Sequence, residues 1–167
     1  VRRELEILWV DSEELSEATV AERLCHADGV IVPGGFGQRG IEGKVEAIRY
    51  CREHKTPYLG VCLGMQCAVI EYARNVLGLE GANTIELASS TPHPVISLMD
   101  DQEGVPLGGT MRLGAYGCDL EEGTLAYELY GEASISERHR HRFEFNNAYR
   151  EAFNASEMTL SGVNPER

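Results

Sequence analysis

The five residues Gly60-Val61-Cys62-Leu63-Gly64 constrain the fold of this 167-residue chain more than any other segment. They follow a short apolar run, residues 56–61, and precede residues 63–77, whose apolar side chains recur at helical spacing. A cysteine between two glycines at a strand-to-helix junction is typical of a nucleophile elbow, a sharp turn that lifts the central side chain out of the backbone. The segment therefore predicts an α/β fold that presents Cys62 at the start of a helix.

The residues before this elbow repeat the order strand, then helix. Residues 5–10 and 30–32 have the apolar patterns of strands, and residues 20–27 and 41–52 have the spacing of helices. Alternating strands and helices with short connections favour a flavodoxin-like, three-layer, mostly parallel sheet.

Beyond Gly81 the pattern changes to hairpin-like strands. Such strands are expected at residues 94–99, 110–116 and 134–145, with a short helix near residues 125–130. We therefore expect antiparallel strands added to the parallel core, within a single domain over residues 1–167.

Charge and composition exclude several classes of function. The formal net charge of −12 repels phosphate backbones and anionic lipid surfaces, so neither nucleic acid nor membrane is an expected partner. Apolar stretches are far shorter than the roughly 20 residues that span a bilayer, and residues 1–5 lack the apolar core of a secretory signal, so we expect a cytoplasmic protein. Five cysteines without a Cys-x-x-Cys pair argue against a disulfide framework and a structural zinc site, and no metal is expected.

Cys62 has two interpretations. It could be an ordinary buried thiol, since free cysteine is among the most buried residue types. As a nucleophile it would benefit from the helix N-terminus, which favours the thiolate, and the Leu63 N–H would point to where an oxyanion forms. Residues 33–37, Pro-Gly-Gly-Phe-Gly, lie at the end of a neighbouring predicted strand and supply the second backbone donor that acyl transfer needs. This second loop favours the nucleophile.

Four segments together closely resemble the class I, triad-type glutamine amidotransferase domain of CTP synthases. They are residues 32–37, 60–66, 109–114 and 137–144. The elbow alone would indicate only the class I amidotransferase superfamily. The likeness runs in order from about Leu5 to Val163.

The resemblance implies a role for each matching residue. Cys62 is the implied nucleophile, which attacks the glutamine carboxamide and forms a glutamyl thioester. Gly35 and Leu63 are the implied oxyanion-hole donors. The implied substrate-binding residues are Gly35, Leu63, Gly64, Met65, Gln66, Glu86 and Arg142.

Within that set, Glu86 matches the carboxylate that holds the substrate's α-ammonium, and Arg142 the guanidinium that pairs with its α-carboxylate. The planar fork of an arginine suits a carboxylate bidentately. Glu86 could instead be a solvated surface acid.

The arginines of the last segment also have alternatives. Arg138, Arg140 and Arg142 could form one exposed face of an alternating strand, with His139 and His141 structural on the other. The same alternation would aim the arginines into a cleft and offset the negative field for an anionic group. Arg112 is expected to be structural or interdomain.

The general base of such a site is missing. The family supplies it as His-Pro-Glu, and this tripeptide does not occur in the sequence. Asn164-Pro165-Glu166 resembles a decayed version, but it follows closely on the arginine-rich strand and is better explained as an earlier loop. His93 lacks a glutamate two residues later and is not expected to be the base. We expect a domain incomplete at both ends and, as it stands, a poor glutaminase.

The resemblance implies hydrolysis of L-glutamine, with the ammonia supplied for the ATP-dependent amination of UTP to CTP. No cofactor is expected in this domain; ATP and Mg would be used by a synthetase domain, the implied partner, with GTP as an effector and a homo-oligomer formed through that domain. Two rivals remain: a degenerate module that binds glutamine or a synthetase without catalysis, and a cysteine hydrolase of γ-glutamyl peptides. Residues 109–114 disfavour the second rival.

Overall fold

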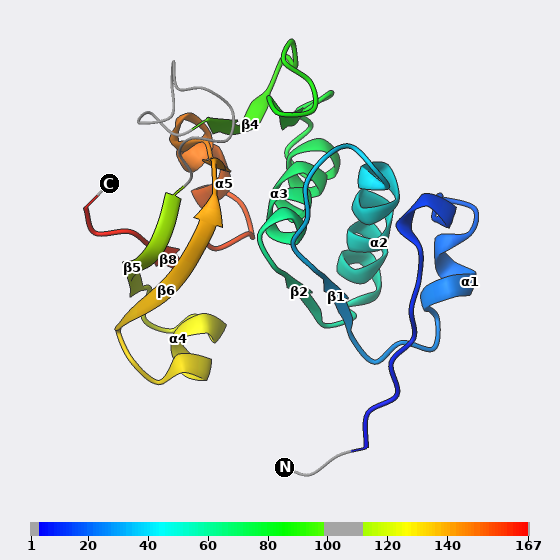
Figure 1. Cartoon of the computed structure of the whole chain (residues 1–167), viewed down its shortest axis with the longest axis horizontal. Helices are drawn as coiled ribbons and strands as arrows, with labels where there is room; N and C mark the ends of the chain where they lie inside the picture. The colour runs from blue at the N-terminus through cyan, green and yellow to red at the C-terminus, as the bar shows by residue number, and fades with distance from the viewer. Residues whose placement is uncertain (1–3, 99–111, 167) are drawn as a thin grey trace. The chain divides into compact units, whose positions relative to one another are not determined.

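A computed structural model gives the structure of the chain and describes residues 4–98 and 112–166 (Figure 1). Contacts within the chain divide it into two compact units, Val1–His93 and Pro94–Arg167. The expected single domain over residues 1–167 stays a prediction.

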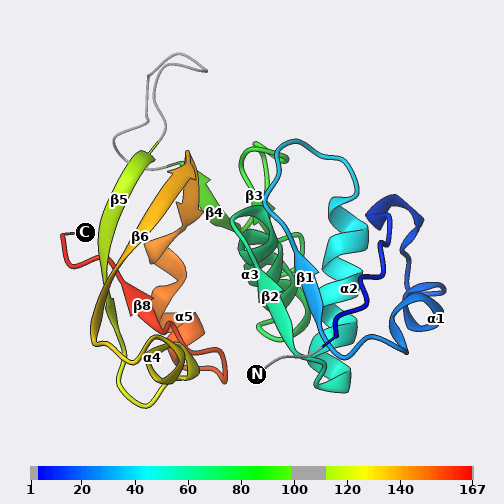
Figure 2. The same cartoon turned by 60° about the horizontal axis from the view of Figure 1, so that its bottom comes forward.

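The first unit consists of strands and helices in alternation. In chain order its elements are η1 (Ser12–Glu14), α1 (Val20–Leu24), β1 (Val30–Val32), α2 (Ile41–His54), β2 (Tyr58–Gly60), α3 (Leu63–Asn75) and β3 (Asn83–Thr84). Strands β1 and β2 lie side by side and pair in parallel, with Ile31 opposite Leu59 (Figure 2). This is the strand–helix–strand arrangement that the apolar pattern predicts.

The core of the first unit lies where α2 packs against α3. Val45 and Ile48 of α2 are buried, as are Cys67 and Ile70 of α3, and both pairs lie at helical spacing. Helix α3 also contacts β1 and β2, so its start is placed at the carboxyl ends of both strands. A smaller cluster of Val20, Leu24 and Ala47 joins α1 to α2.

The strand expected at residues 5–10 is wrong. Residues 4–10 form no strand, and Leu5 and Trp9 are 80% and 87% exposed. Alternation shows that a segment could have an apolar and a polar face. A strand also needs a neighbour with free backbone N–H and C=O groups, and no described strand pairs with these residues.

The second unit is built from antiparallel strands. Its elements are β4 (Pro94–Leu98), β5 (Arg112–Leu120), α4 (Leu125–Tyr130), β6 (Ser134–His141), β7 (Phe143–Phe145), η3 (Asn147–Tyr149), α5 (Arg150–Asn154) and β8 (Gly162–Val163). Strand β5 pairs with β6 and with β8, and β4 pairs with β7. Residues 99–111 of the expected strands lie outside the described residues.

Aromatic packing holds this second unit together. Phe153 of α5 is fully buried and meets the ring of Phe145 edge-on, with ring centroids 5.1 Å apart. Val95 and Ile96 of β4 are also fully buried. The parallel pair and helices of the first unit, together with the antiparallel pairs of the second, confirm the α/β class with added antiparallel strands.

Candidate active site

The turn at Cys62 has the strained backbone expected of a nucleophile elbow. Cys62 joins β2 to α3 with φ of 53° and ψ of −104°. A non-glycine residue with positive φ is uncommon and costs about 1–3 kcal/mol, so it persists only where the surroundings hold it in place. The Cys62 side chain is half-buried at the first turn of the helix.

The two glycines of the elbow are required by close backbone approach. A Cβ on Gly60 would lie 2.6 Å from the carbonyl carbon of Gly64, and a Cβ on Gly64 would overlap the carbonyl oxygen of Val32. Strands β1 and β2 and the start of α3 therefore meet where only hydrogen fits.

Three backbone hydrogen bonds fix the path of the turn. The Val61 N–H donates to the Val32 carbonyl at 3.0 Å, and the Gly64 N–H donates to the Val61 carbonyl at 2.9 Å. The Gln66 N–H donates to the Cys62 carbonyl at 3.1 Å. The elbow is thus attached to β1 on one side and continuous with α3 on the other.

The glycine-rich loop after β1 lies against the elbow. A Cβ on Gly34 would be 3.4 Å from the Cβ of Cys62, and one on Gly35 would be 3.4 Å from Cδ2 of Leu63. The N–H groups of Gly35 and Leu63 donate to no acceptor within the part of the chain that the structure describes. The structure therefore brings both expected oxyanion donors together beside Cys62.

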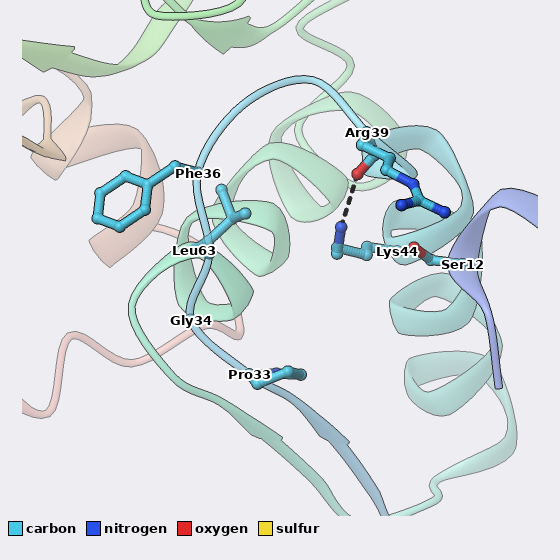
Figure 3. Close-up of a pocket in the computed structure, with 8 residues that line it drawn as sticks. Ser12, Pro33, Gly34, Phe36, Arg39, Lys44 and Leu63 are labelled. Carbon is cyan, nitrogen blue, oxygen red and sulfur yellow. Dashed lines mark hydrogen bonds between the residues drawn. The ribbon is translucent and has the colours of Figure 1, made fainter. Parts of the chain in front are cut away.

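A small open pocket borders these donors (Figure 3). Its volume is about 240 Å³, below the range of drug-sized ligand sites. Its lining residues are Ser12, Pro33, Gly34, Gly35, Phe36, Arg39, Lys44 and Leu63. Of the residues expected to bind substrate, only Gly35 and Leu63 line it.

The cations of this pocket already have partners. The Arg39 side chain donates to Glu13 at 2.6 Å and lies 3.6 Å from Asp11. The Lys44 ammonium donates to the Arg39 carbonyl at 2.8 Å, the dashed line in Figure 3. We therefore locate the chemistry by the strained elbow rather than by the pocket.

The other expected substrate residues of the first unit differ in exposure. Gln66 is buried in the first turns of α3, whereas Met65 is exposed. Glu86 is exposed, and its N–H donates to the hydroxyl of the buried Thr84 at 3.3 Å. The structure thus places Gln66 and Met65 on the helix that carries the elbow, and Glu86 in a turn after β3.

The arginine-rich strand belongs to the second unit and does not keep its alternation to the end. Arg138 and Arg140 are exposed, while His139 and His141 are half-buried and meet each other at 2.8 Å between ring nitrogens. Arg142 lies at the bend between β6 and β7, so the face shared by three arginines is wrong for this residue. Its Nε atom is buried and has no hydrogen-bond partner among the described residues.

No group of three or more His, Cys, Asp or Glu residues could hold a metal ion among residues 4–98 and 112–166. Within the same residues, no helix combines the length and the hydropathy needed to cross a membrane.

The family to which the sequence matches is consistent with the nucleophile elbow and with the two N–H donors of Gly35 and Leu63 beside it. Residues 1–166 match the family Glutamine amidotransferase class-I. The chain therefore belongs to the class I glutamine amidotransferases.

Within this class, the chain is similar to CTP synthases. The chain is 62% identical over 163 residues to a CTP synthase of Rubrobacter xylanophilus, and 58% identical over 161 residues to one of Caldanaerobacter subterraneus. These alignments cover 97% and 96% of this chain and 30% of each relative. A solved glutaminase domain of Trypanosoma brucei CTP synthase with bound acivicin matches with a TM-score of 0.91 and 40% identity, over 97% of this chain and 63% of that one. The chain thus spans about a third of the length of its curated relatives.

Proposed function

We propose that this chain is the glutaminase part of a CTP synthase, which hydrolyses L-glutamine and supplies ammonia for the ATP-dependent amination of UTP to CTP. The observation that carries the proposal is the positive φ of Cys62 beside the N–H groups of Gly35 and Leu63, which donate to no acceptor among residues 4–98 and 112–166. The similarity to CTP synthases supports it and does not favour a non-catalytic module.

The reaction would proceed by acyl transfer. The Cys62 thiolate attacks the side-chain carboxamide carbon of glutamine, and the N–H groups of Gly35 and Leu63 stabilise the resulting oxyanion. The amide nitrogen takes up one proton, in sum the proton that the Cys62 thiol lost on ionisation. The carbon–nitrogen bond then breaks, ammonia leaves, and a glutamyl thioester remains. Water then attacks the thioester, which releases glutamate and restores the thiol.

Substrate recognition would use charges at both ends of the amino acid. Glu86 would accept the α-ammonium, and Arg142 would bind the α-carboxylate through its guanidinium fork. The buried Arg142 Nε without a described partner supports this role, because a ligand oxygen would satisfy it. Gly64, Met65 and Gln66 would contact the substrate from the first turns of α3.

The general base is the part of the triad without a candidate. Cys62 makes no hydrogen bond to a histidine within the described residues, and the sequence contains no His-Pro-Glu. The Asn164 side chain accepts a hydrogen bond from the Glu166 N–H at 2.8 Å. This local contact is typical of a turn within a loop, as the sequence predicts, and not of a catalytic base. We therefore expect the 167 residues alone to turn glutamine over slowly.

The remaining parts of the proposed reaction belong to a synthetase domain. That domain would bind UTP, ATP and Mg and form the homo-oligomer, with GTP as an effector. We place the enzyme in the cytoplasm, where its nucleotide substrates occur.

The proposal is tested by mass spectrometry with a diazoketone that mimics glutamine and alkylates activated amidotransferase cysteines. We expect one adduct, mapped to Cys62, that excess glutamine prevents and γ-glutamyl peptides do not. A Cys62→Ala variant is the control and should take up no adduct. Absence of an adduct on the unchanged protein would favour the non-catalytic module, and protection by γ-glutamyl peptides alone would favour a peptidase.

A further inference from the structure

Tyr58, which neither the elbow motif nor the expected site includes, contacts the elbow directly. It is the first residue of β2, and its hydroxyl donates to the carbonyl oxygen of Gly64 at 2.8 Å. We propose that Tyr58 is a positioning residue whose hydroxyl holds the first turn of α3 so that Cys62 and the Leu63 N–H keep their reactive orientation. This inference rests on the proposed glutaminase function.

The carbonyl that Tyr58 holds is two residues beyond the nucleophile. On its other side, Gly64 is packed so closely against β1 that a Cβ would overlap the Val32 carbonyl oxygen. The first turn of α3 therefore cannot move toward β1. The Tyr58 hydroxyl opposes movement in which the Gly64 carbonyl swings away from β2.

Such a restraint matters because the turn is strained. Cys62, with φ of 53°, would lower its backbone energy by rotating toward an ordinary conformation. That rotation would displace its side chain and the following peptide N–H, the two groups that act on substrate. A hydrogen bond at Gly64 raises the cost of the displacement without touching substrate.

The hydroxyl of Tyr58 is suited to a permanent donor role. Its side chain is half-buried, and burial raises the pKa of Tyr58 well above its usual value. The hydroxyl therefore keeps its proton over the whole pH range in which a glutaminase is assayed. The ring packs in the same place whether or not the hydroxyl is present, so Tyr58→Phe isolates the hydrogen bond.

The matched control is Tyr50→Phe. Tyr50 is also half-buried in the first unit, and its ring stacks on His54 with centroids 4.0 Å apart. It lies on α2, away from the elbow. The control removes the same hydroxyl group from a tyrosine that does not contact α3's first turn.

The experiment measures glutamine hydrolysis, diazoketone inactivation and ammonia-dependent CTP formation in the full-length protein. For Tyr58→Phe we expect kcat for hydrolysis and the inactivation rate constant to fall about five- to tenfold, the size of one net hydrogen bond. The KM for glutamine should change by less than kcat, since the proposed charged contacts of Glu86 and Arg142 are intact. Ammonia-dependent synthesis should stay unchanged, since the synthetase is intact. Replacing Tyr58 with para-aminophenylalanine, which keeps a donor at the same place, should restore most of the rate. Tyr50→Phe should behave like the unchanged protein.

Three results would overturn the inference. The first is a Tyr58→Phe variant with hydrolysis and inactivation rates equal to those of the unchanged protein. The second is an equal loss in Tyr50→Phe, which would indicate general destabilisation. The third is failure of the donor analogue to restore the rate. An unchanged protein that neither hydrolyses glutamine nor takes up the diazoketone would instead refute the proposed function.

Discussion

Glu71 of α3 is a buried acid paired with Arg52, and loss of this pair should lower the free energy of unfolding. Its side chain is 1% exposed, and Arg52 of α2 reaches it with Nε at 3.1 Å from both carboxylate oxygens and Nη2 at 2.8 Å from Oε1. Asn75 adds an amide hydrogen bond at 3.1 Å. The hydrogen bond to Glu71 raises the pKa of Arg52, so the guanidinium is charged at every working pH. The pair fastens α2 to the helix that begins after Cys62.

Arg52→Met keeps most of the side-chain length and leaves the buried carboxylate with one neutral donor. Breaking a fully buried pair costs about 3–5 kcal/mol. The Arg52 side chain is 32% exposed, so solvent screens part of the interaction, and we expect a loss of about 2–3 kcal/mol. Glu71→Gln keeps the shape and lets the arginine reach water, so it should cost only about 1 kcal/mol.

Urea unfolding followed by far-UV circular dichroism measures these losses. At a slope of about 2 kcal/mol per molar, Arg52→Met should lower the midpoint by roughly 1–1.5 M. The double variant should lose about 1 kcal/mol less than the sum of the single ones. Arg23→Met is the control, because its 2.7 Å pair with Glu14 is 52% and 59% exposed. A midpoint for Arg52→Met equal to that of Arg23→Met would refute the reasoning.

Three further predictions follow from burial and close contact. In the full-length enzyme that the proposed function implies, Gly64→Ala should lower glutamine hydrolysis more than about 100-fold with ammonia-dependent synthesis retained, because its Cβ would displace the elbow. A variant that hydrolyses glutamine normally in steady-state assays would contradict this. Burial raises the pKa of Cys51 and of Cys67 to about 11. Iodoacetamide at pH 8 should therefore leave both thiols unmodified while it labels the exposed Cys25. Labelling of the two buried cysteines should rise only above about pH 10. Phe153→Ala should destabilise the second unit by about 3–5 kcal/mol in thermal unfolding; a change below about 1 kcal/mol would count against its place in the core.

The elbow could be predicted because its causes are local. The glycines at 60 and 64 and the apolar runs beside them already require a tight strand-to-helix turn, and the backbone of Cys62 has the strain that this implies. Helices α2 and α3 were likewise predictable, since their buried side chains follow helical spacing. Tyr58 had no sequence signal, because one tyrosine at a strand start does not reveal the carbonyl it meets.

Features that depend on a distant neighbour could not be predicted in the same way. Residues 5–10 alternate like a strand, yet pairing is decided by whether another strand offers a free edge. Arg142 continues the alternation of Arg138 and Arg140 in sequence, but a bend ends β6 at His141 and takes it off that face. Alternation predicts which face a residue shares only while the strand lasts.

The expected site residues also divide into those positioned by local backbone packing and those that depend on side-chain charge. Gly35, Cys62 and Leu63 have geometric support, because backbone packing alone brings the two loops together and leaves two donors beside a strained cysteine. Glu86 and Arg142 are proposed to act through side-chain charge, which many surface residues share. The family resemblance implies their roles, and the buried Nε of Arg142 supports the role of that residue. Variants at the two groups should therefore differ in kind. Changes at the elbow should lower kcat, whereas Glu86→Gln and Arg142→Lys should mainly raise the KM for glutamine, because they weaken contacts present before and during the reaction.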